Sequence, residues 1–195
     1  MNRLLLSAAA VAALFLTTER SHAQAFVAGD NILGIGIGAG GSYSAYRSYS
    51  ATSPVFLAHF EHALGVKAGP GVIGAGAFFG YKTVSYHYDI YGPYYYDYRW
   101  NYIQFGARAS YHWNEWHGID KLDMYAGVLA GVNIVTRSDD SNYPYSNYGY
   151  LGTSGSGFRH DVFAGARWYF SDGFAAWGEL GYGMANIAVG LNFKF

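Results

Sequence analysis

Three histidines stand near a carboxylate, which is the pairing that general acid–base chemistry requires. The pairs are His87 with Asp89, His160 with Asp161, and His112 with Glu115. An imidazole oriented by a carboxylate can move a proton to or from a serine hydroxyl, as in hydrolases. No third orienting group stands beside these pairs, and the chain has no Cys for nucleophilic or metal chemistry. We therefore expect no catalytic residue, no metal ion and no cofactor.

Eight charged residues share a second pattern, because they fall on one face of segments whose residues alternate with period two. They are Glu61, Lys82, Arg108, Asp123, Asp161, Arg167, Glu179 and Lys194. The same face is rich in glycine, whereas the opposite face is apolar, as at Phe56, Ala58 and Phe60. The sorting indicates a narrow interior that holds the charges and an exterior that meets an apolar medium.

The eight charges are balanced in sign, which indicates that they neutralise one another. An unpaired charge in a narrow interior is costly. We expect one salt-bridge network made of Glu61, Arg108, Asp123, Arg167 and Glu179. The alternative is a proton or ion pathway, because charges at membrane depth are frequently functional.

Strands must position these side chains, and period-two alternation recurs from residue 30 onward. We expect eight strands at about 30–42, 54–63, 71–83, 100–112, 121–135, 158–170, 174–183 and 187–195. The connections near 43–53, 84–99 and 136–157 are long and polar, and the others are short. Short turns at one end and long loops at the other are typical of a transmembrane β-barrel. Eight strands leave an interior that side chains fill. Ten strands are the alternative if one of the two longest loops pairs with itself.

The composition supports an apolar surrounding. Charged residues are 13%, about half the usual fraction of a soluble domain. The hydrophobic fraction of 51% excludes a disordered chain, and the net charge of -1 does not favour nucleic acid. The sorting of charged and apolar residues onto opposite strand faces would by itself also fit a soluble β-sandwich. Aromatic residues near strand ends favour a membrane, and we expect interfacial girdles from Trp100, Trp113, Trp116, Trp168, Tyr169, Phe170 and Phe174.

Residues 1–23 have the features of a secretory signal peptide. Arg3 precedes an apolar run from Leu4 to Leu16, which is too short to span a bilayer as a helix. Small residues then allow cleavage after Ala23, with cleavage after Ala25 as the alternative. We therefore expect export and a single barrel domain over 24–195. An uncleaved membrane anchor is the alternative.

The last residues, GLNFKF, alternate and end in Phe195, and the segments KLDMYAGVLAG and FAGARWYF precede them. With these features the chain resembles the small outer-membrane β-barrel superfamily of Gram-negative bacteria, of the OmpX and OmpA transmembrane-domain type. The resemblance implies an all-β fold of eight antiparallel transmembrane strands, with periplasmic termini and extracellular loops. It also implies an outer-membrane location, lipid as a partner, and Phe195 as the signal that the barrel-assembly machinery reads. We expect a monomer.

Fourteen of the 20 Tyr fall in the three long segments expected to be loops. Tyr among Ser, Gly and Asn is also typical of antibody binding loops, where it offers large contacts at low entropic cost. The candidates for recognition are Tyr88, Tyr91, Tyr94, Tyr95, Tyr96, Tyr98, Tyr145 and Tyr148. We expect a structural role, or cell-surface recognition of a glycan or protein, and not an enzyme. The alternatives are a small enzyme that acts on lipid and a narrow-pore transport protein.

Overall fold

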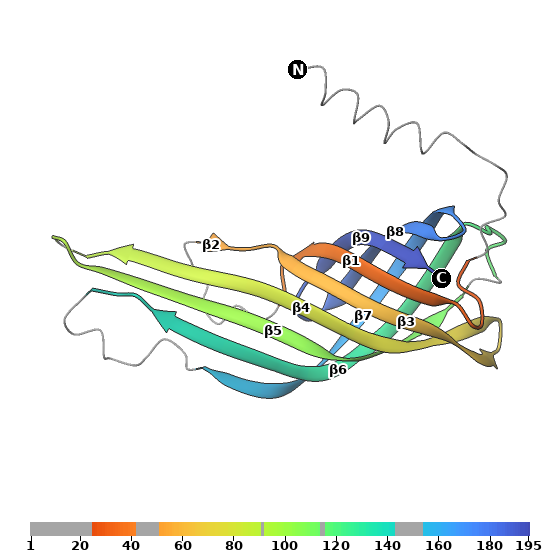
Figure 1. The fold of residues 1–195 in the computed structure, drawn as a ribbon, viewed down its shortest axis with the longest axis horizontal. Helices are drawn as coiled ribbons and strands as arrows, with labels where there is room; N and C mark the ends of the chain where they lie inside the picture. The colour runs from red at the N-terminus through yellow and green to blue at the C-terminus, as the bar shows by residue number, and fades with distance from the viewer. Residues whose placement is uncertain (1–24, 42–50, 91, 114–115, 143–153) are drawn as a thin grey trace, which may run out of the picture.

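The computed structural model describes residues 25–41, 51–90, 92–113, 116–142 and 154–195. Each strand is antiparallel to its neighbours, and eight strands form a closed ring in the order β1-β3-β4-β5-β6-β7-β8-β9, with β9 paired back to β1. The strands of the ring are β1 (Asn31–Ala39), β3 (Val55–Ala68), β4 (Gly71–Asp89), β5 (Tyr95–His112), β6 (Leu122–Asp139), β7 (Gly155–Ser171), β8 (Phe174–Tyr182) and β9 (Ile187–Lys194). The predicted eight-stranded antiparallel barrel is confirmed (Figure 1).

The two ends of the barrel differ. The terminal end holds the start of β1, the end of β9 and the turns that follow β3, β5 and β7; Asn31 and Phe195 exchange backbone hydrogen bonds there, at 3.0 and 2.9 Å. The extended end holds the connections that follow β1, β4, β6 and β8. No helix in the described part of the chain is long and apolar enough to cross a membrane.

The alternation predicted from the sequence determines which side chains face outward. In β9, Val189 and Leu191 are exposed, whereas Ala188 and Asn192, which point to the other face of the strand, are buried. The exposed outer face of the ring is apolar, as at Ile35, Phe79 and Val128. A barrel with an apolar exterior and a polar interior is suited to lipid, where exposed charge is costly.

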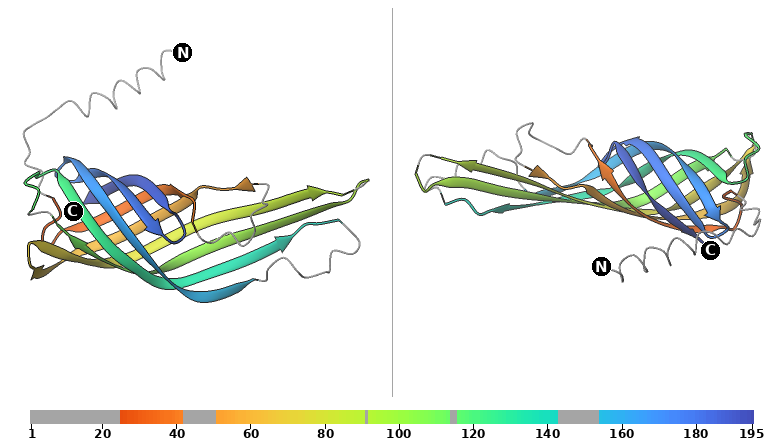
Figure 2. Two further views of the ribbon diagram at one scale, coloured as in Figure 1. Left: turned by 180° about the vertical axis from the view of Figure 1, so that it is seen from behind. Right: turned by 90° about the horizontal axis from the view of Figure 1, so that it is seen from above.

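Three strands continue well beyond the ring at the extended end. β4, β5 and β6 are 19, 18 and 18 residues long, whereas β1 and β8 each have nine. Their continuations are Thr83–Asp89, Tyr95–Asn101 and Thr136–Asp139, which we call the extended sheet. Figures 1 and 2 show that it projects from the barrel as a curved sheet. A two-residue strand, β2 (Ala51–Thr52), pairs with β4 at its base.

The extended sheet corrects the expectation of a long loop over 84–99. Residues 84–89 and 95–99 instead pair as strands, from Val84 with Trp100 to Asp89 with Tyr95, and only 90–94 connect them. Aromatic residues favour strands, and cross-strand aromatic pairs stabilise such a hairpin. The many tyrosines that suggested a recognition loop are therefore also the residues that continue the sheet.

The polarity of the two faces reverses where the extended sheet begins. The outer face changes from apolar to polar, because Tyr81, Thr83 and Asn101 form hydrogen bonds of 2.9–3.1 Å with one another. The inner face becomes mainly aromatic and apolar, although the ion pair of Arg137 and Asp139 also lies on it. It carries the aromatic cluster, which consists of Val55, Val84, Tyr98, Trp100, Tyr102 and Met184. The reversal indicates that the outer face leaves lipid for water at this level.

The structure also changes the expected girdle. Trp113, Trp116, Trp168 and Phe170 are exposed, and Phe174 is partly exposed. Trp100 and Tyr169 are instead buried on the inner face, at 5% and 0% exposure, so their assignment to a girdle was wrong. Trp100 lies on the same face of its strand as the inward Arg108, and Tyr169 on the same face as the inward Arg167. The alternation of side chains along a strand therefore decides their direction, and nearness to a strand end does not.

Candidate functional site: a charge cluster inside the barrel

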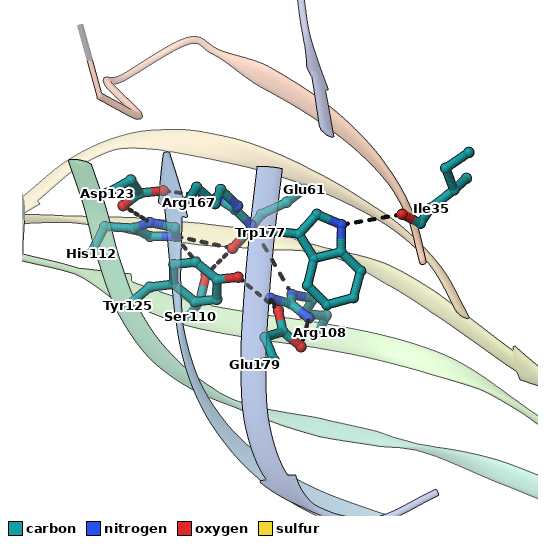
Figure 3. Close-up of polar contacts among 10 residues, drawn as sticks. All are labelled: Ile35, Glu61, Arg108, Ser110, His112, Asp123, Tyr125, Arg167, Trp177 and Glu179. Carbon is teal, nitrogen blue, oxygen red and sulfur yellow. Dashed lines mark hydrogen bonds and ion pairs between the residues drawn. The ribbon is translucent and has the colours of Figure 1, made fainter. Parts of the chain in front are cut away.

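Inward-facing side chains of five strands meet in the terminal half of the barrel. β3 contributes Glu61 and β7 contributes Arg167, while β5, β6 and β8 contribute the rest. Alternation aligns the residues at positions i, i+2 and i+4 on one face, so one strand can supply several members. The charge cluster consists of Glu61, Arg108, Ser110, His112, Asp123, Tyr125, Arg167 and Glu179 (Figure 3).

Two guanidinium groups organise the charge cluster. Arg167 donates to Asp123 Oδ2 at 3.0 Å and also to Glu61 Oε2. Arg108 binds Glu179 with two hydrogen bonds, of 2.5 and 3.3 Å, and its Nε lies 3.8 Å from Glu61 Oε2. Glu61 therefore joins the two arginines, and all five charges that the sequence groups into a network lie in one connected set.

Aromatic rings surround the guanidinium groups. The Arg167 Cζ lies 4.3 Å from the centre of the Tyr125 ring, and the Arg108 Cζ lies 3.9 Å from that of Phe163. Tyr125 also donates to Glu179 Oε1 at 2.9 Å. Cation–π contacts of this kind are strongest where water is excluded, so the rings add to the stabilisation that the carboxylates give.

Three members of the charge cluster are missed by the sequence analysis, namely Ser110, His112 and Tyr125. His112 is considered only beside Glu115, which lies outside the described residues. The structure gives it a different carboxylate, because His112 Nδ1 lies 2.7 Å from Asp123 Oδ1. The alternation of Arg108, Ser110 and His112 along β5 is the signal that could have identified them.

Ser110, His112 and Asp123 have the connectivity of a serine hydrolase triad. Ser110 Oγ lies 2.9 Å from His112 Nε2, and His112 Nδ1 faces Asp123. Hydrolysis needs a serine that substrate can reach and a histidine that can accept its proton. Ser110 is instead 5% exposed and donates to Glu61, and His112 Nε2 also lies 3.1 Å from Glu61 Oε1. Both reactive atoms are therefore already bound by Glu61 within the barrel.

The segment before β1 covers the charge cluster at the terminal end. Phe26 is fully buried; its ring centre lies 4.3 Å from that of His112 and 5.5 Å from the Arg167 Cζ. A short turn anchors the segment, since Gly29 N donates to Ala63 O at 3.0 Å and Val27 N to Asp30 Oδ2 at 3.0 Å. Side chains thus pack across both ends of the interior, Phe26 at one and the aromatic cluster at the other.

The remaining predicted interior charges also face inward but lie outside the charge cluster. Lys82 donates to Gly40 O at 3.1 Å near the extended end. Asp161 Oδ2 accepts from Gln104 Nε2 at 2.8 Å and lines a cavity of about 60 Å³ between the charge cluster and the aromatic cluster. Lys194 pairs with Asp30 at 3.2 Å at the terminal end.

The other two histidine pairs lie on exposed surfaces. His87 contacts Asp89 at 3.2 Å and Asp97 at 3.3 Å on the extended sheet. His160 and Asp161 point to opposite faces of β7, since His160 is exposed and Asp161 is buried. Among the described residues, no set of three His, Asp and Glu side chains is arranged to hold a metal ion.

Tyrosines of the extended sheet form an ordered array on its inner face. Tyr86 and Tyr98 are cross-strand partners with near-parallel rings 6.3 Å apart, and Tyr88 and Tyr96 continue the array at 6.4 and 6.0 Å. The Arg137 Cζ lies 4.5 Å from the centre of the Tyr98 ring.

The recognition candidates therefore differ in accessibility. Tyr88 and Tyr94 are exposed, Tyr95 and Tyr96 are partly exposed, and Tyr98 is buried. Tyr91, Tyr145 and Tyr148, like the expected signal peptide, lie outside the described residues. The side chain of Phe195 is exposed at the terminal end.

No protein-family profile matches the sequence, and a comparison with curated proteins finds no match. Solved structures do match. Ail, the attachment invasion locus protein of Yersinia pestis, in complex with the heparin analogue sucrose octasulfate, is 14% identical over 87% of this chain and 100% of that chain, with a TM-score of 0.42. The N-terminal β-barrel domain of Pseudomonas aeruginosa OprF is 16% identical over 85% and 96%, with a TM-score of 0.41. Ail in a phospholipid bilayer nanodisc is 12% identical over 86% and 99%, with a TM-score of 0.38.

The fold itself follows from this chain's own hydrogen bonds, which close eight antiparallel strands into a ring. The fold predicted from the sequence is thus met: the chain is a small eight-stranded antiparallel β-barrel with an apolar exterior and a charged interior.

Proposed function

We propose that this protein is a monomeric outer-membrane barrel that presents its extended sheet for recognition at the cell surface. The observation that carries the proposal is the reversal of polarity at Tyr81, Thr83 and Asn101. Below that level the outer face is apolar and suits lipid, and above it both faces of a three-stranded sheet project from the membrane. Residues 1–23 serve as a cleaved signal peptide, and Phe195 serves as the signal for the barrel-assembly machinery.

The packed interior supports an anchoring role rather than transport or catalysis. Phe26 and the aromatic cluster lie across the two ends, and the Ser110 hydroxyl is engaged by Glu61. We expect no stepwise conductance from the refolded wild-type barrel in a planar lipid bilayer. A steady single-channel conductance would contradict the anchoring role and favour narrow-pore transport.

The tyrosine array supports recognition of a glycan or a protein. Tyr88 is 56% exposed at the outer end of the array, where its ring and hydroxyl are available for contact. Tyr is favoured at recognition surfaces because its rigid ring buries a large area and its hydroxyl forms hydrogen bonds. Arg137 lies beside the array, over the Tyr98 ring, while Asp89 and Asp97 contact His87 on the opposite face of the sheet.

The test is a binding screen of the refolded barrel in nanodiscs against glycans and matrix proteins. A matched variant replaces residues 88–96 by Asn-Gly, which retains the pairing of His87 with Asp97 across a two-residue hairpin turn. We expect a ligand that binds the wild type and is lost in the variant. Binding that survives the replacement would contradict recognition by the hairpin.

Point variants then test the tyrosines themselves. Tyr88→Ala should weaken binding about tenfold, the loss typical of an interface residue worth more than 1 kcal/mol. Tyr182→Ala is the control, because Tyr182 is also exposed, at 67%, but lies on the outer face of the ring. Equal losses in both variants would show that general surface change, and not the array, is responsible. No binding by the wild type would leave a purely structural membrane role.

A further inference from the structure

His112 of β5 lies among charged and polar groups that approach it from three other strands of the ring. Asp123 and Tyr125 approach from β6, Glu61 from β3 and Arg167 from β7, while Ser110 lies on its own strand. Phe26 covers the ring from the terminal end, with ring centres 4.3 Å apart. The imidazole is 0% exposed, so no water molecule from the bulk can hydrogen-bond to it directly.

If the His112 ring is neutral, there are too few hydrogen atoms for the contacts that its Nε2 makes. Nε2, Ser110 Oγ and Glu61 Oε1 are in mutual contact, because Ser110 Oγ bonds to both others and Nε2 lies 3.1 Å from Glu61 Oε1. If Nδ1 donates to Asp123, a neutral ring carries no hydrogen on Nε2. Ser110 would then provide the only hydrogen for three contacts, and two lone pairs would face each other. A second hydrogen in this triangle removes the conflict.

The charge balance indicates where that hydrogen resides. The charge cluster contains the carboxylates Glu61, Asp123 and Glu179, but only two arginines. A proton on His112 gives three cations and three anions, and each ring nitrogen then donates to a carboxylate. Buried charges persist when they are paired and hydrogen-bonded in this way.

We propose that the charge cluster is a buried proton-binding site in which His112 is held as an imidazolium between Asp123 and Glu61. The bound proton is the third cation of the cluster and links strands β3, β5 and β6 in the terminal half of the barrel. Phe26 separates it from the periplasmic side. The site does not depend on any ligand of the extended sheet, and it goes beyond the proposed recognition role.

The decisive measurement is the protonation state of the histidine side chains in the ¹⁵N-labelled, refolded full barrel. Two-dimensional ¹H–¹⁵N spectra distinguish an imidazolium from either neutral tautomer, and contacts with the Phe26 ring protons assign His112 without a variant. We expect His112 to be doubly protonated at about pH 7.5, where an unperturbed imidazole is largely neutral. A neutral His112 at that pH would overturn the proposal, including the case in which Glu61 carries the proton.

Two carboxylate variants provide an independent readout. Asp123→Asn removes one of the two carboxylates at His112, so the imidazolium signal should be lost at the same pH. Asp161→Asn is the matched control, since Asp161 is also buried but bonds to Gln104 outside the charge cluster. The imidazolium signal of His112 should persist in this variant. An imidazolium that persists in Asp123→Asn, or that is lost in both variants, would contradict the proposed site.

Discussion

Removal of the Arg167 guanidinium tests whether the charge cluster stabilises the barrel. Arg167 is 0% exposed and touches two carboxylates, Glu61 and Asp123, from the centre of the cluster. Arg167→Met retains much of the side-chain volume but removes the charge and its hydrogen bonds. Both carboxylates then remain inside the barrel with one partner fewer.

The expected cost follows from the contacts that remain. Breaking a buried ion pair by removing one partner typically costs about 3–5 kcal/mol. His112 still contacts both carboxylates, and the Arg108 Nε still lies 3.8 Å from Glu61, so the lower part of that range applies. We expect a loss of about 3–4 kcal/mol in the free energy of unfolding, which is roughly two to three orders of magnitude in the equilibrium constant.

Reversible urea unfolding in lipid vesicles, followed by tryptophan fluorescence, measures this loss. Arg99→Met is the control, because Arg99 is exposed on the extended sheet and its removal should change the free energy by less than about 0.5 kcal/mol. Combining Arg167→Met with Glu61→Gln restores the charge balance and should recover at least half of the loss. A loss below about 1 kcal/mol for Arg167→Met would refute the assignment of a stabilising role to the cluster.

Three further predictions concern the closure of the barrel. Phe26→Ala should destabilise it by about 3 kcal/mol in the same unfolding assay, because Phe26 is fully buried. Gly190→Val should prevent formation of the folded, heat-modifiable species on gels, because a Cβ at this position would lie 2.7 Å from Trp177 Nε1 of β8. Gly157→Val is the control and should fold normally, because a Cβ there meets nothing within 4 Å. Arg167→Met alone should not conduct ions in planar bilayers, whereas its combination with Trp100→Ala and Phe26→Ala, which removes the packing at both ends, should. Conductance from the single variant would show that the aromatic cluster does not close the extended end.

Much of the barrel can be predicted from local alternation. Period two assigns each side chain to a face, and lipid tolerates charge on only one of them. The inward parity of Arg108 and Arg167, and the outward parity of Phe56, therefore follow without any knowledge of neighbouring strands. The same alternation also places Trp100 on the inner face. The assignment of Trp100 to the girdle was wrong because it gave more weight to the nearby strand end than to this alternation.

The contacts among the inward side chains are decided by the closed ring. Arg167 and Glu61 are 106 residues apart in the sequence, and they meet because the barrel brings β7 opposite β3. The carboxylate that His112 Nδ1 contacts is Asp123 of β6, because strand pairing sets the register of β5 against β6. Alternation specifies a face but not a partner, so sequence alone identifies the charges and not the position of the histidine among them.

The length of the extended sheet is likewise a tertiary property. Residues 84–99 carry tyrosines that suit either a recognition loop or a strand, and cross-strand pairing from Val84–Trp100 to Asp89–Tyr95 selects the strand. The two faces of each strand and the sorting of charge follow from the amino-acid sequence, because they depend on local periodicity and on the cost of charge in lipid. The pairing of the charges, the position of Phe26 and the reach of the extended sheet follow from the folded barrel, because each depends on groups that are distant in the chain.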